Sequence, residues 1–202
     1  MITIVNYGMG NLGSLLNMFK RIGVKARIES DPEAVRDAEK LVLPGVGAFD
    51  AAMHRINETP GLRAALDHKA LIECVPVIGV CLGMQLLTRS SEEGKLPGLG
   101  WIDGEAIRFP RIDGLKVPHM GWNVAHPATP SALTNDIGIE PRYYFVHSYF
   151  VKVDNPVHSL MRTQYGVEFD SAIGRDNIYG AQFHPEKSHR FGMKILQNFA
   201  EL

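Results

Sequence analysis

The strongest constraint on the fold is an alternation of short apolar runs with helical patterns, which repeats four times within the first 89 residues. Each run is short enough for one buried strand, and the segments between runs place apolar residues at helical spacing. The predicted strands occupy residues 2–5, 24–28, 40–43 and 76–80, and charged residues within them are Lys25, Arg27 and Lys40. This alternation predicts a three-layer α/β fold, with a mostly parallel central sheet and helices on both faces. Functional groups of such folds collect at the carboxyl ends of the strands.

The second half of the chain differs in composition. Glycines and prolines interrupt short segments after Arg89, and the later apolar runs indicate strands rather than helix–strand units. These runs are Ala106–Phe109, Tyr143–Val153, Val167–Ile173 and Ile178–Phe183. No long polar linker precedes them, so we expect antiparallel strands added to the same sheet within a single domain, residues 1–202. Ser188 is expected to cap a final helix that has one apolar face.

Charge and the N-terminal residues exclude several classes of protein. With 21 basic and 22 acidic side chains the net charge is -1, which gives no electrostatic footprint for nucleic acid or for an anionic membrane. The N-terminal apolar run lacks a basic start and breaks at Gly8 and Gly10. We therefore expect neither a signal peptide nor a membrane span, and a cytoplasmic location.

Neither a metal nor a cofactor is predicted. The only cysteines are Cys74 and Cys81, whose spacing fits neither a disulfide framework nor a metal site. No two histidines show metal-ligand spacing with an acidic partner. The turn Gly8-x-Gly10 lacks the third glycine of a dinucleotide fingerprint at its expected place. Cys74 ends an apolar helical stretch and is expected in the core.

Cys81 lies where the fourth apolar run gives way to a helical pattern. Gly79 and Gly83 flank it and leave the room that a strained turn needs when it pushes a nucleophile toward substrate. A cysteine at the start of a helix is also favoured as the thiolate, the reactive form. The alternative is a small apolar residue in a glycine-containing buried strand, and this stretch alone does not decide between the two.

His184 and Glu186 offer a base for such a nucleophile and a group to orient it. In an extended segment these two side chains lie on the same side, and Pro185 biases His184 away from helical geometry. A carboxylate bonded to one imidazole nitrogen leaves the other free to face a thiol. For this short motif alone, a surface turn is the alternative.

The loop after the third apolar run, residues 44–49, contains Gly45 and Gly47. Glycines let backbone amides point where side chains would block access, so the loop could form an oxyanion hole, although a tight strand-to-helix turn is the alternative. Among the histidines, three on helical segments are expected in solvent, namely His54, His68 and His189. His119 and His147 lie among aromatic residues and could be substrate walls or core.

Several motifs together resemble a known family. Residues 79–85 and 183–188 resemble the class I (triad) glutamine amidotransferases, and the match covers nearly the whole chain. Residues 6–12, 43–49, 117–123 and 145–149 resemble the glutaminase subunits of imidazole glycerol phosphate synthase. Pro-Gly-Val-Gly at 44–47 replaces the Pro-Gly-Gly usual in the wider class, which also points to this family. Asn6 stands where many relatives have aspartate, which affects only the local turn bonding.

The resemblance implies a flavodoxin-like fold and a thioester mechanism. Cys81 would attack the side-chain amide of glutamine, His184 would protonate the departing ammonia and then activate water, and Glu186 would orient His184. The oxyanion would be bound by the amide of Leu82 and by the loop at Val46–Gly47. The residues implied for glutamine binding are Gly47, Gln85, His147, Ser148 and Tyr149.

The resemblance also implies a partner, the cyclase subunit, which receives ammonia and forms imidazole glycerol phosphate in histidine biosynthesis. A chain of 202 residues has no room for a barrel of that kind, which typically needs about 250 residues. The contact face is expected around Cys81, with Asn11, Met120, Trp122 and Lys187 as contributors. The alternatives are a stand-alone cysteine hydrolase, a catalytically silent binding subunit, and triad amidotransferases that feed purine, pyridoxal or anthranilate synthesis.

Overall fold

The computed structural model describes residues 1–202 and contains six α-helices and thirteen strands. The helices are α1 (Leu12–Arg21), α2 (Pro32–Arg36), α3 (Phe49–Glu58), α4 (Leu62–Asp67), α5 (Leu82–Leu86) and α6 (His189–Glu201). The strands are β1 (Ile2–Val5), β2 (Ala26–Glu29), β3 (Lys40–Gly45), β4 (Val77–Cys81), β5 (Ser90–Ser91), β6 (Gly104–Arg108), β7 (His119–Val124), β8 (His126–Pro127), β9 (Arg142–His147), β10 (Tyr149–Val153), β11 (Ser159–Tyr165), β12 (Val167–Arg175) and β13 (Ile178–Ala181). None of the helices combines the length and hydropathy that a membrane span requires.

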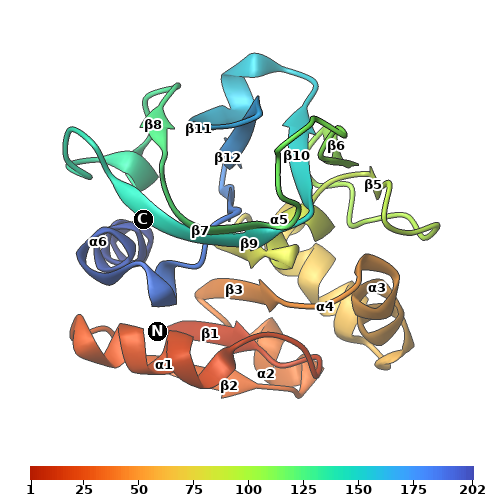
Figure 1. Cartoon of the computed structure of the whole chain (residues 1–202). Coiled ribbons are helices and arrows are strands. Elements are labelled where there is room, and N and C mark those ends of the chain that lie inside the picture. Colours follow the sequence, from red (N-terminus) through yellow and green to blue (C-terminus); the bar gives the residue numbers. More distant parts are fainter.

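Eleven strands form the main sheet, in which neighbouring strands run in the order β2-β1-β3-β4-β13-β12-β10-β6-β5. In addition, β11 pairs with β12, and β8 pairs with β11. The first five strands in this order are parallel to one another. Antiparallel pairs then extend the sheet through β12, β10 and β6. The predicted α/β fold with a mostly parallel centre and antiparallel additions is confirmed (Figure 1).

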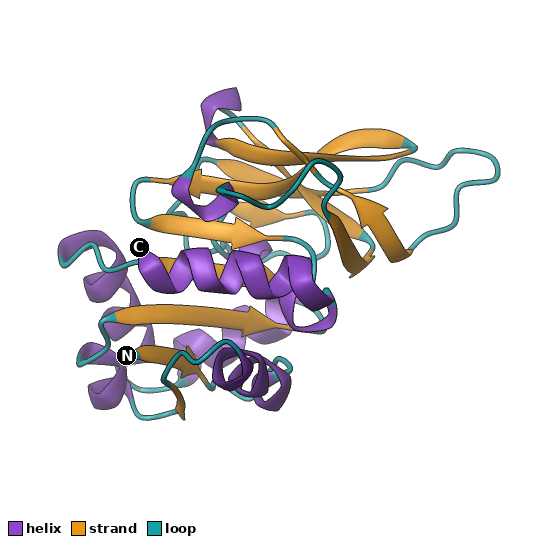
Figure 2. Cartoon of the chain, turned by 90° about the vertical axis from the view of Figure 1, so that its left-hand side faces the viewer, coloured by secondary structure: helices purple, strands orange, loops and turns teal.

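Alternation along β3 divides its apolar side chains between two cores. Leu41 and Leu43 belong to a buried cluster with side chains of α3 and α4, whereas Val42 belongs to a second cluster with side chains of α1 and α6. A parallel strand covered on both faces must be apolar at nearly every position, which explains the continuous run at 40–43. The longer helices gather around the parallel strands, and the antiparallel part consists mainly of strands and loops (Figure 2).

Two details of the second half differ from the prediction. The run Tyr143–Val153, expected as one strand of the main sheet, parts at Ser148. β9 pairs with β7 in a separate two-stranded sheet, whereas β10 lies in the main sheet. β13 was expected to be antiparallel to its neighbouring strands. It is antiparallel to β12, but the expectation is wrong for β4, to which β13 is parallel. A tight turn at Asp176 reverses the chain after β12, and β12 itself runs against the direction of β4.

Cys74 and Ser188 also differ from expectation. Cys74 is exposed, because the chain leaves the π-helical turn after α4 with a left-handed backbone at this residue, φ 52°. Ser188 precedes α6 but makes no side-chain capping bond. Its Oγ instead donates to the carbonyl of His184 at 2.6 Å and accepts from the amide of Tyr144 at 3.0 Å. Ser188 therefore ties β9 to the segment that carries His184.

Gly83, in the first turn of α5, allows the helix to approach the sheet closely. A Cβ atom at this position would overlap the backbone carbonyl of Leu43 in β3. We expect Gly83→Ala to lower the free energy of unfolding by about 3 kcal/mol, although alanine is the better helix former. Gly13 in α1 is the matched control, since a Cβ there meets no atom within 4 Å, and Gly13→Ala should raise stability by up to about 1 kcal/mol. Urea unfolding of both variants measures the contrast, and equal effects would contradict it.

Candidate active site

Cys81 occupies a sharp turn, since β4 ends at Cys81 and α5 begins at Leu82. Its φ of 56° and ψ of -112° are uncommon for a residue with a side chain, and strain of this kind concentrates at functional positions. A Cβ on Gly79 would lie 2.5 Å from the carbonyl oxygen of Gly83, so this turn cannot form without glycine at that position. The strand, turn and helix predicted around Cys81 are present.

His184 and Glu186 follow β13, and both side chains are buried. His184 is extended, with φ -96° and ψ 99°, and a 3₁₀ turn from Pro185 to Lys187 brings Glu186 back toward the imidazole. Nδ1 of His184 lies 2.8 Å from Oε1 of Glu186. An ionised carboxylate only accepts hydrogen bonds, so Nδ1 carries a hydrogen. Nε2 of His184 faces no hydrogen-bond partner other than Cys81 and is left for that sulfur and a substrate.

The charge of His184 is set by its two neighbours. Burial opposes a positive imidazolium, but the contacts with Cys81 and Glu186 outweigh burial and raise the pKa of His184 to about 10. The imidazole is therefore protonated at neutral pH. A protonated imidazole between a thiol sulfur and a carboxylate can stabilise a thiolate and can donate a proton to a leaving group.

Cys81 and His184 open into a cavity of about 330 Å³, a volume typical of small-molecule sites. The cavity is lined by Val46, Gly47, Cys81, Leu82, Gln85, Glu93, Pro118, Val146, His147, Ser148, Tyr149 and His184. Nine of these residues are ones that the sequence assigns to catalysis, to the oxyanion hole or to glutamine binding. The tenth, Glu186, reaches the cavity only through His184.

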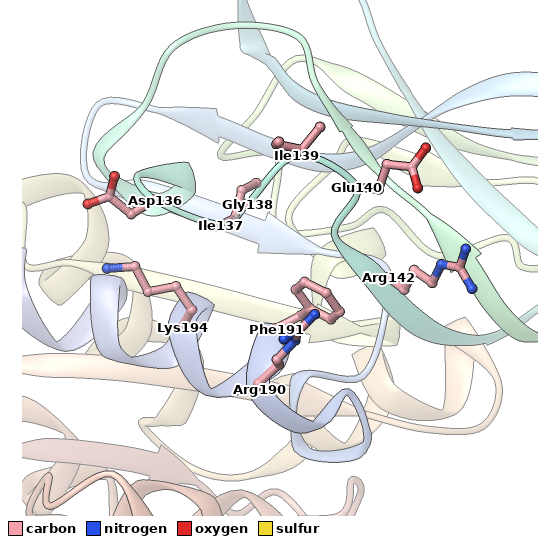
Figure 3. Close-up of a pocket in the computed structure, with 9 residues that line it drawn as sticks. All are labelled: Asp136, Ile137, Gly138, Ile139, Glu140, Arg142, Arg190, Phe191 and Lys194. Carbon is pink, nitrogen blue, oxygen red and sulfur yellow. The ribbon is translucent and has the colours of Figure 1, made fainter.

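A larger hollow of about 760 Å³ lies between α6 and the loop that precedes β9 (Figure 3). Its charged lining residues are Asp136, Glu140, Arg142, Arg190 and Lys194. It contains neither a cysteine nor a histidine, so it offers no nucleophile and no base of the kind found beside Cys81. The smaller cavity is therefore the candidate active site.

Comparison with known proteins identifies the relatives of the chain. The family model described as "Glutamine amidotransferase class-I" matches residues 3–202. "Imidazole glycerol phosphate synthase subunit HisH 2" of Pseudomonas aeruginosa is 50% identical over 202 residues, which is 100% of both chains. The protein of the same name from Methanococcus maripaludis is 50% identical over 199 residues, 98% of each chain. This chain belongs to the HisH family of class-I glutamine amidotransferases.

Solved structures share the fold of this HisH-family chain at much lower identity. A structure titled "Crystal structure of glutamine amidotransferase" aligns with a TM-score of 0.78 at 16% identity, covering 99% of this chain and 97% of the other. The structure of PurLQS from Thermotoga maritima aligns with a TM-score of 0.76 at 17% identity, with the same coverage. The resemblance found in the sequence is confirmed. The chain is about 50% identical over its full length to HisH proteins but only 16 to 17% identical to these solved structures, with which it shares the fold.

In this HisH-family chain, the loop after β3, predicted to bind an oxyanion, is held at one end and open at the other. The hydroxyl of Tyr7 donates to the carbonyl of Pro44, and burial, with a smaller contribution from Cys81, raises the pKa of Tyr7 well above its usual range. Beyond Pro44, Val46 and Gly47 are exposed, and neither of their amides donates a hydrogen bond within the chain. Gly47 has φ 102°, which favours glycine. Two unpaired amides therefore border the cavity.

His119 and His147 form a neutral pair behind the cavity. Burial lowers the pKa of His119 to about 4, and burial, together with the nearby imidazoles, lowers that of His147 to about 3. Nδ1 of His147 lies 2.8 Å from the carbonyl oxygen of Tyr149, which only accepts, so Nε2 of His147 has no hydrogen. That nitrogen accepts from Nδ1 of His119 at 3.0 Å. His147 is thus a wall of the cavity, and His119 is a core residue that supports it.

Three lining residues, Glu93, Pro118 and Val146, were not predicted as site residues from the sequence, and neither was Tyr7. Glu93 lines the cavity, and its Oε2 accepts from the amide of Phe49 at 2.9 Å, which fixes the carboxylate at the start of α3. Tyr7 supports the loop after β3 through its hydrogen bond to the carbonyl of Pro44. Glu93 lies in a polar, glycine-containing segment that resembles an ordinary surface loop. Tyr7 is the second residue after β1, and this position just beyond a strand end was the signal in the sequence that could have indicated it.

Three of the four residues predicted to contact a partner lie on or beside the two-stranded sheet of β7 and β9. Met120 and Trp122 are 62% and 48% exposed on β7, whose neighbour β9 carries the cavity residue Val146 opposite Met120. Trp122 stacks on His189, with ring centroids 5.4 Å apart. Lys187 is exposed, with its ammonium 5.7 Å from the ring centre of Tyr144 in β9. The fourth residue, Asn11, precedes α1 and makes no capping bond.

Proposed function

We propose that this chain hydrolyses glutamine at Cys81 and supplies the ammonia to the cyclase subunit of imidazole glycerol phosphate synthase, in histidine biosynthesis. The observation that carries the proposal is the single cavity into which Cys81 opens beside the buried pair of His184 and Glu186. Membership of the HisH family supports the choice of substrate and of pathway. A cytoplasmic location is part of the proposal, supported by two free cysteines.

The reaction would proceed through a thioester. Sγ of Cys81 attacks the side-chain amide carbon of glutamine, and the tetrahedral intermediate collapses when protonated His184 gives its proton to the departing nitrogen. Ammonia leaves, and the glutamyl group remains on sulfur. His184, now neutral, removes a proton from water, which attacks the thioester and releases glutamate. Glu186 holds Nδ1 of His184 throughout, so Nε2 is the atom that exchanges protons.

The oxyanion of the tetrahedral intermediate would lie between the start of α5 and the loop after β3. The turn at Cys81, after which α5 starts at Leu82, and the unpaired amides of Val46 and Gly47 support this assignment of the donors. Removal of one such donor typically raises the barrier by about 3 to 4 kcal/mol. The open end of this loop supports the idea that the donor geometry depends on the partner.

The remaining lining residues would orient glutamine. Glu93 is the one carboxylate among them and suits the α-ammonium of the substrate. Nε2 of Gln85 donates to Tyr149 and Gln182, whereas Oε1 accepts no hydrogen bond within the chain and offers a second acceptor. Ser148 and Tyr149 follow the end of β9 and can provide donors for the α-carboxylate. His147 closes the wall between them.

The partner would be needed because ammonia released into water is protonated and lost. The proposed cyclase subunit takes it up and converts phosphoribulosyl-formimino-aminoimidazole carboxamide ribotide to imidazole glycerol phosphate and aminoimidazole carboxamide ribotide. Exposed apolar side chains near the cavity, Val46, Val117, Met120 and Trp122, support a contact surface at this side. Lys187 and Asn11 are the polar contributors that we propose.

We expect the chain alone to release glutamate from glutamine slowly, and the cyclase subunit loaded with its ribotide to raise the rate at least about tenfold, because the coupling between two sites is typically worth 5- to 150-fold. A coupled glutamate assay measures the rate with and without the partner, and the partner without ribotide is the control. Equal turnover by the chain alone, with the partner, and with the partner and ribotide would contradict the coupling and favour a stand-alone hydrolase. No turnover, with no reaction of Cys81 toward a glutamine-like alkylating analogue, would indicate a silent binding subunit.

A further inference from the structure

The carbonyl oxygen of Tyr149 fixes the orientation of the side chains around it. It lies 3.1 Å from Nε2 of Gln85 and 2.8 Å from Nδ1 of His147. A carbonyl oxygen has lone pairs and no hydrogen, so both partners must donate to it. The side-chain amide of Gln85 is therefore oriented with its nitrogen toward Tyr149.

The orientation of Gln85 in turn determines that of Gln182. The same nitrogen of Gln85 lies 3.1 Å from the end of the Gln182 side chain, and the atom it meets must be an acceptor, Oε1. Gln182 then turns its own amide nitrogen to Sγ of Cys81, at a distance of 3.8 Å. Gln182 is fully buried, so no water competes for this donor.

We propose that Gln182 is a further catalytic residue, which donates an N–H group to the sulfur of Cys81 and stabilises the thiolate that attacks glutamine. A second contact of the same sulfur explains why the donor matters. The carbonyl oxygen of Val146 lies 3.9 Å from Sγ and can only accept, so it interacts favourably with the thiol alone. The N–H group of Gln182 favours the thiolate instead, since a hydrogen bond to an ionised acceptor is roughly twice as strong as one to a neutral acceptor.

Backbone geometry holds Gln182 in this place. It follows β13, and its amide donates to the carbonyl of Ser171 in β12 at 2.9 Å. Gln182 and His184 are two residues apart in the short segment between β13 and the 3₁₀ turn that begins at Pro185. One segment thus delivers both a donor for the sulfur and the imidazolium that pairs with it. This inference rests on the proposed role of Cys81 as nucleophile.

The test measures alkylation of Cys81 by iodoacetamide as a function of pH, followed by mass spectrometry of the full chain. The parent for all measurements carries Cys74→Ser, because Cys74 is exposed and would also react. We expect Gln182→Met to lower the alkylation rate at pH 7 at least about fivefold and to shift the half-maximal rate to higher pH, since each tenfold change corresponds to one pH unit. The control is Asn198→Leu, which removes a buried amide that bonds only to Leu133 and Asn135. It should leave the pH profile unchanged.

A second measurement covers the case in which Gln182→Met does not fold. In the ¹⁵N-labelled parent, the side-chain NH₂ signal of Gln182 should shift when Cys81 is alkylated. Equal pH profiles for the parent and a folded Gln182→Met, or an unmoved NH₂ signal, would overturn the proposal. The pH profile of alkylation could shift as expected in a chain that never releases glutamate. That result would support Gln182 as a donor to the sulfur and would overturn the proposed function instead.

Discussion

Replacing Cys81 by alanine is expected to reduce glutamate release from glutamine at least about 10⁴-fold, because removal of a nucleophile that forms the covalent intermediate leaves only binding and the oxyanion donors. The loss should appear in kcat, both for the chain alone and in the presence of the proposed cyclase partner. Binding of glutamine should persist, since Cys81 is only one of the twelve residues that line the cavity and the other eleven are unchanged. Isothermal titration with glutamine and the coupled glutamate assay measure the two effects separately.

The fold of the Cys81→Ala variant should be preserved. Alanine meets the same left-handed backbone at φ 56° that cysteine tolerates, so the strain in the turn is nearly unchanged. Cys74→Ser is the matched control, because Cys74 is the only other cysteine, also has a positive φ, and is exposed far from any assigned role. It should keep parental activity. If Cys81→Ala retained more than one hundredth of the parental rate, the nucleophile would have to be sought elsewhere.

Local sequence pattern predicted the parallel half of the fold well because its inner strands β1, β3 and β4 are buried on both faces. Continuous apolar runs such as 40–43 are a direct consequence of that burial, and helical spacing between them is equally direct. The antiparallel half was harder. Tyr143–Val153 is apolar along its whole length, and nothing in the run indicates that Ser148 divides it between two sheets. The direction of β13 depends on a turn at Asp176 and on the path of β12, which no local pattern encodes.

The candidate site divides in the same way. The glycines around Cys81 and the spacing of His184 and Glu186 follow from requirements of the local backbone, so the sequence alone indicated these residues. Glu93 and Gln182 acquire a role only from long-range neighbours, the amide of Phe49 and the sulfur of Cys81. Such neighbours depend on tertiary packing. A polar residue at the end of a buried strand, like Gln182, is nevertheless a signal that could be used.

Replacing Glu186 by glutamine should lower kcat by about 10³- to 10⁴-fold, since the loss of the orienting carboxylate in other triads has an effect of this size. The carboxylate is one of the contacts that hold the pKa of His184 near 10, so its removal lowers that pKa. The alkaline limb of the kcat profile, where the proton donor is lost, should therefore move to lower pH by more than one unit. Glu58→Gln is the matched control, because Glu58 pairs with His54 at 3.7 Å on the exposed surface and should change nothing.

The stability of the Glu186→Gln variant should depend on pH in the same sense. A histidine whose pKa is raised in the folded state adds stability that is fully present below its ordinary pKa of 6.5 and is lost as pH rises toward 10. The difference in free energy of unfolding between parent and variant should therefore be largest near pH 6 and shrink toward pH 10, as measured by urea unfolding at several pH values. An alkaline limb at the same pH in both proteins, with a constant stability difference, would show that Glu186 packs beside His184 without setting its charge.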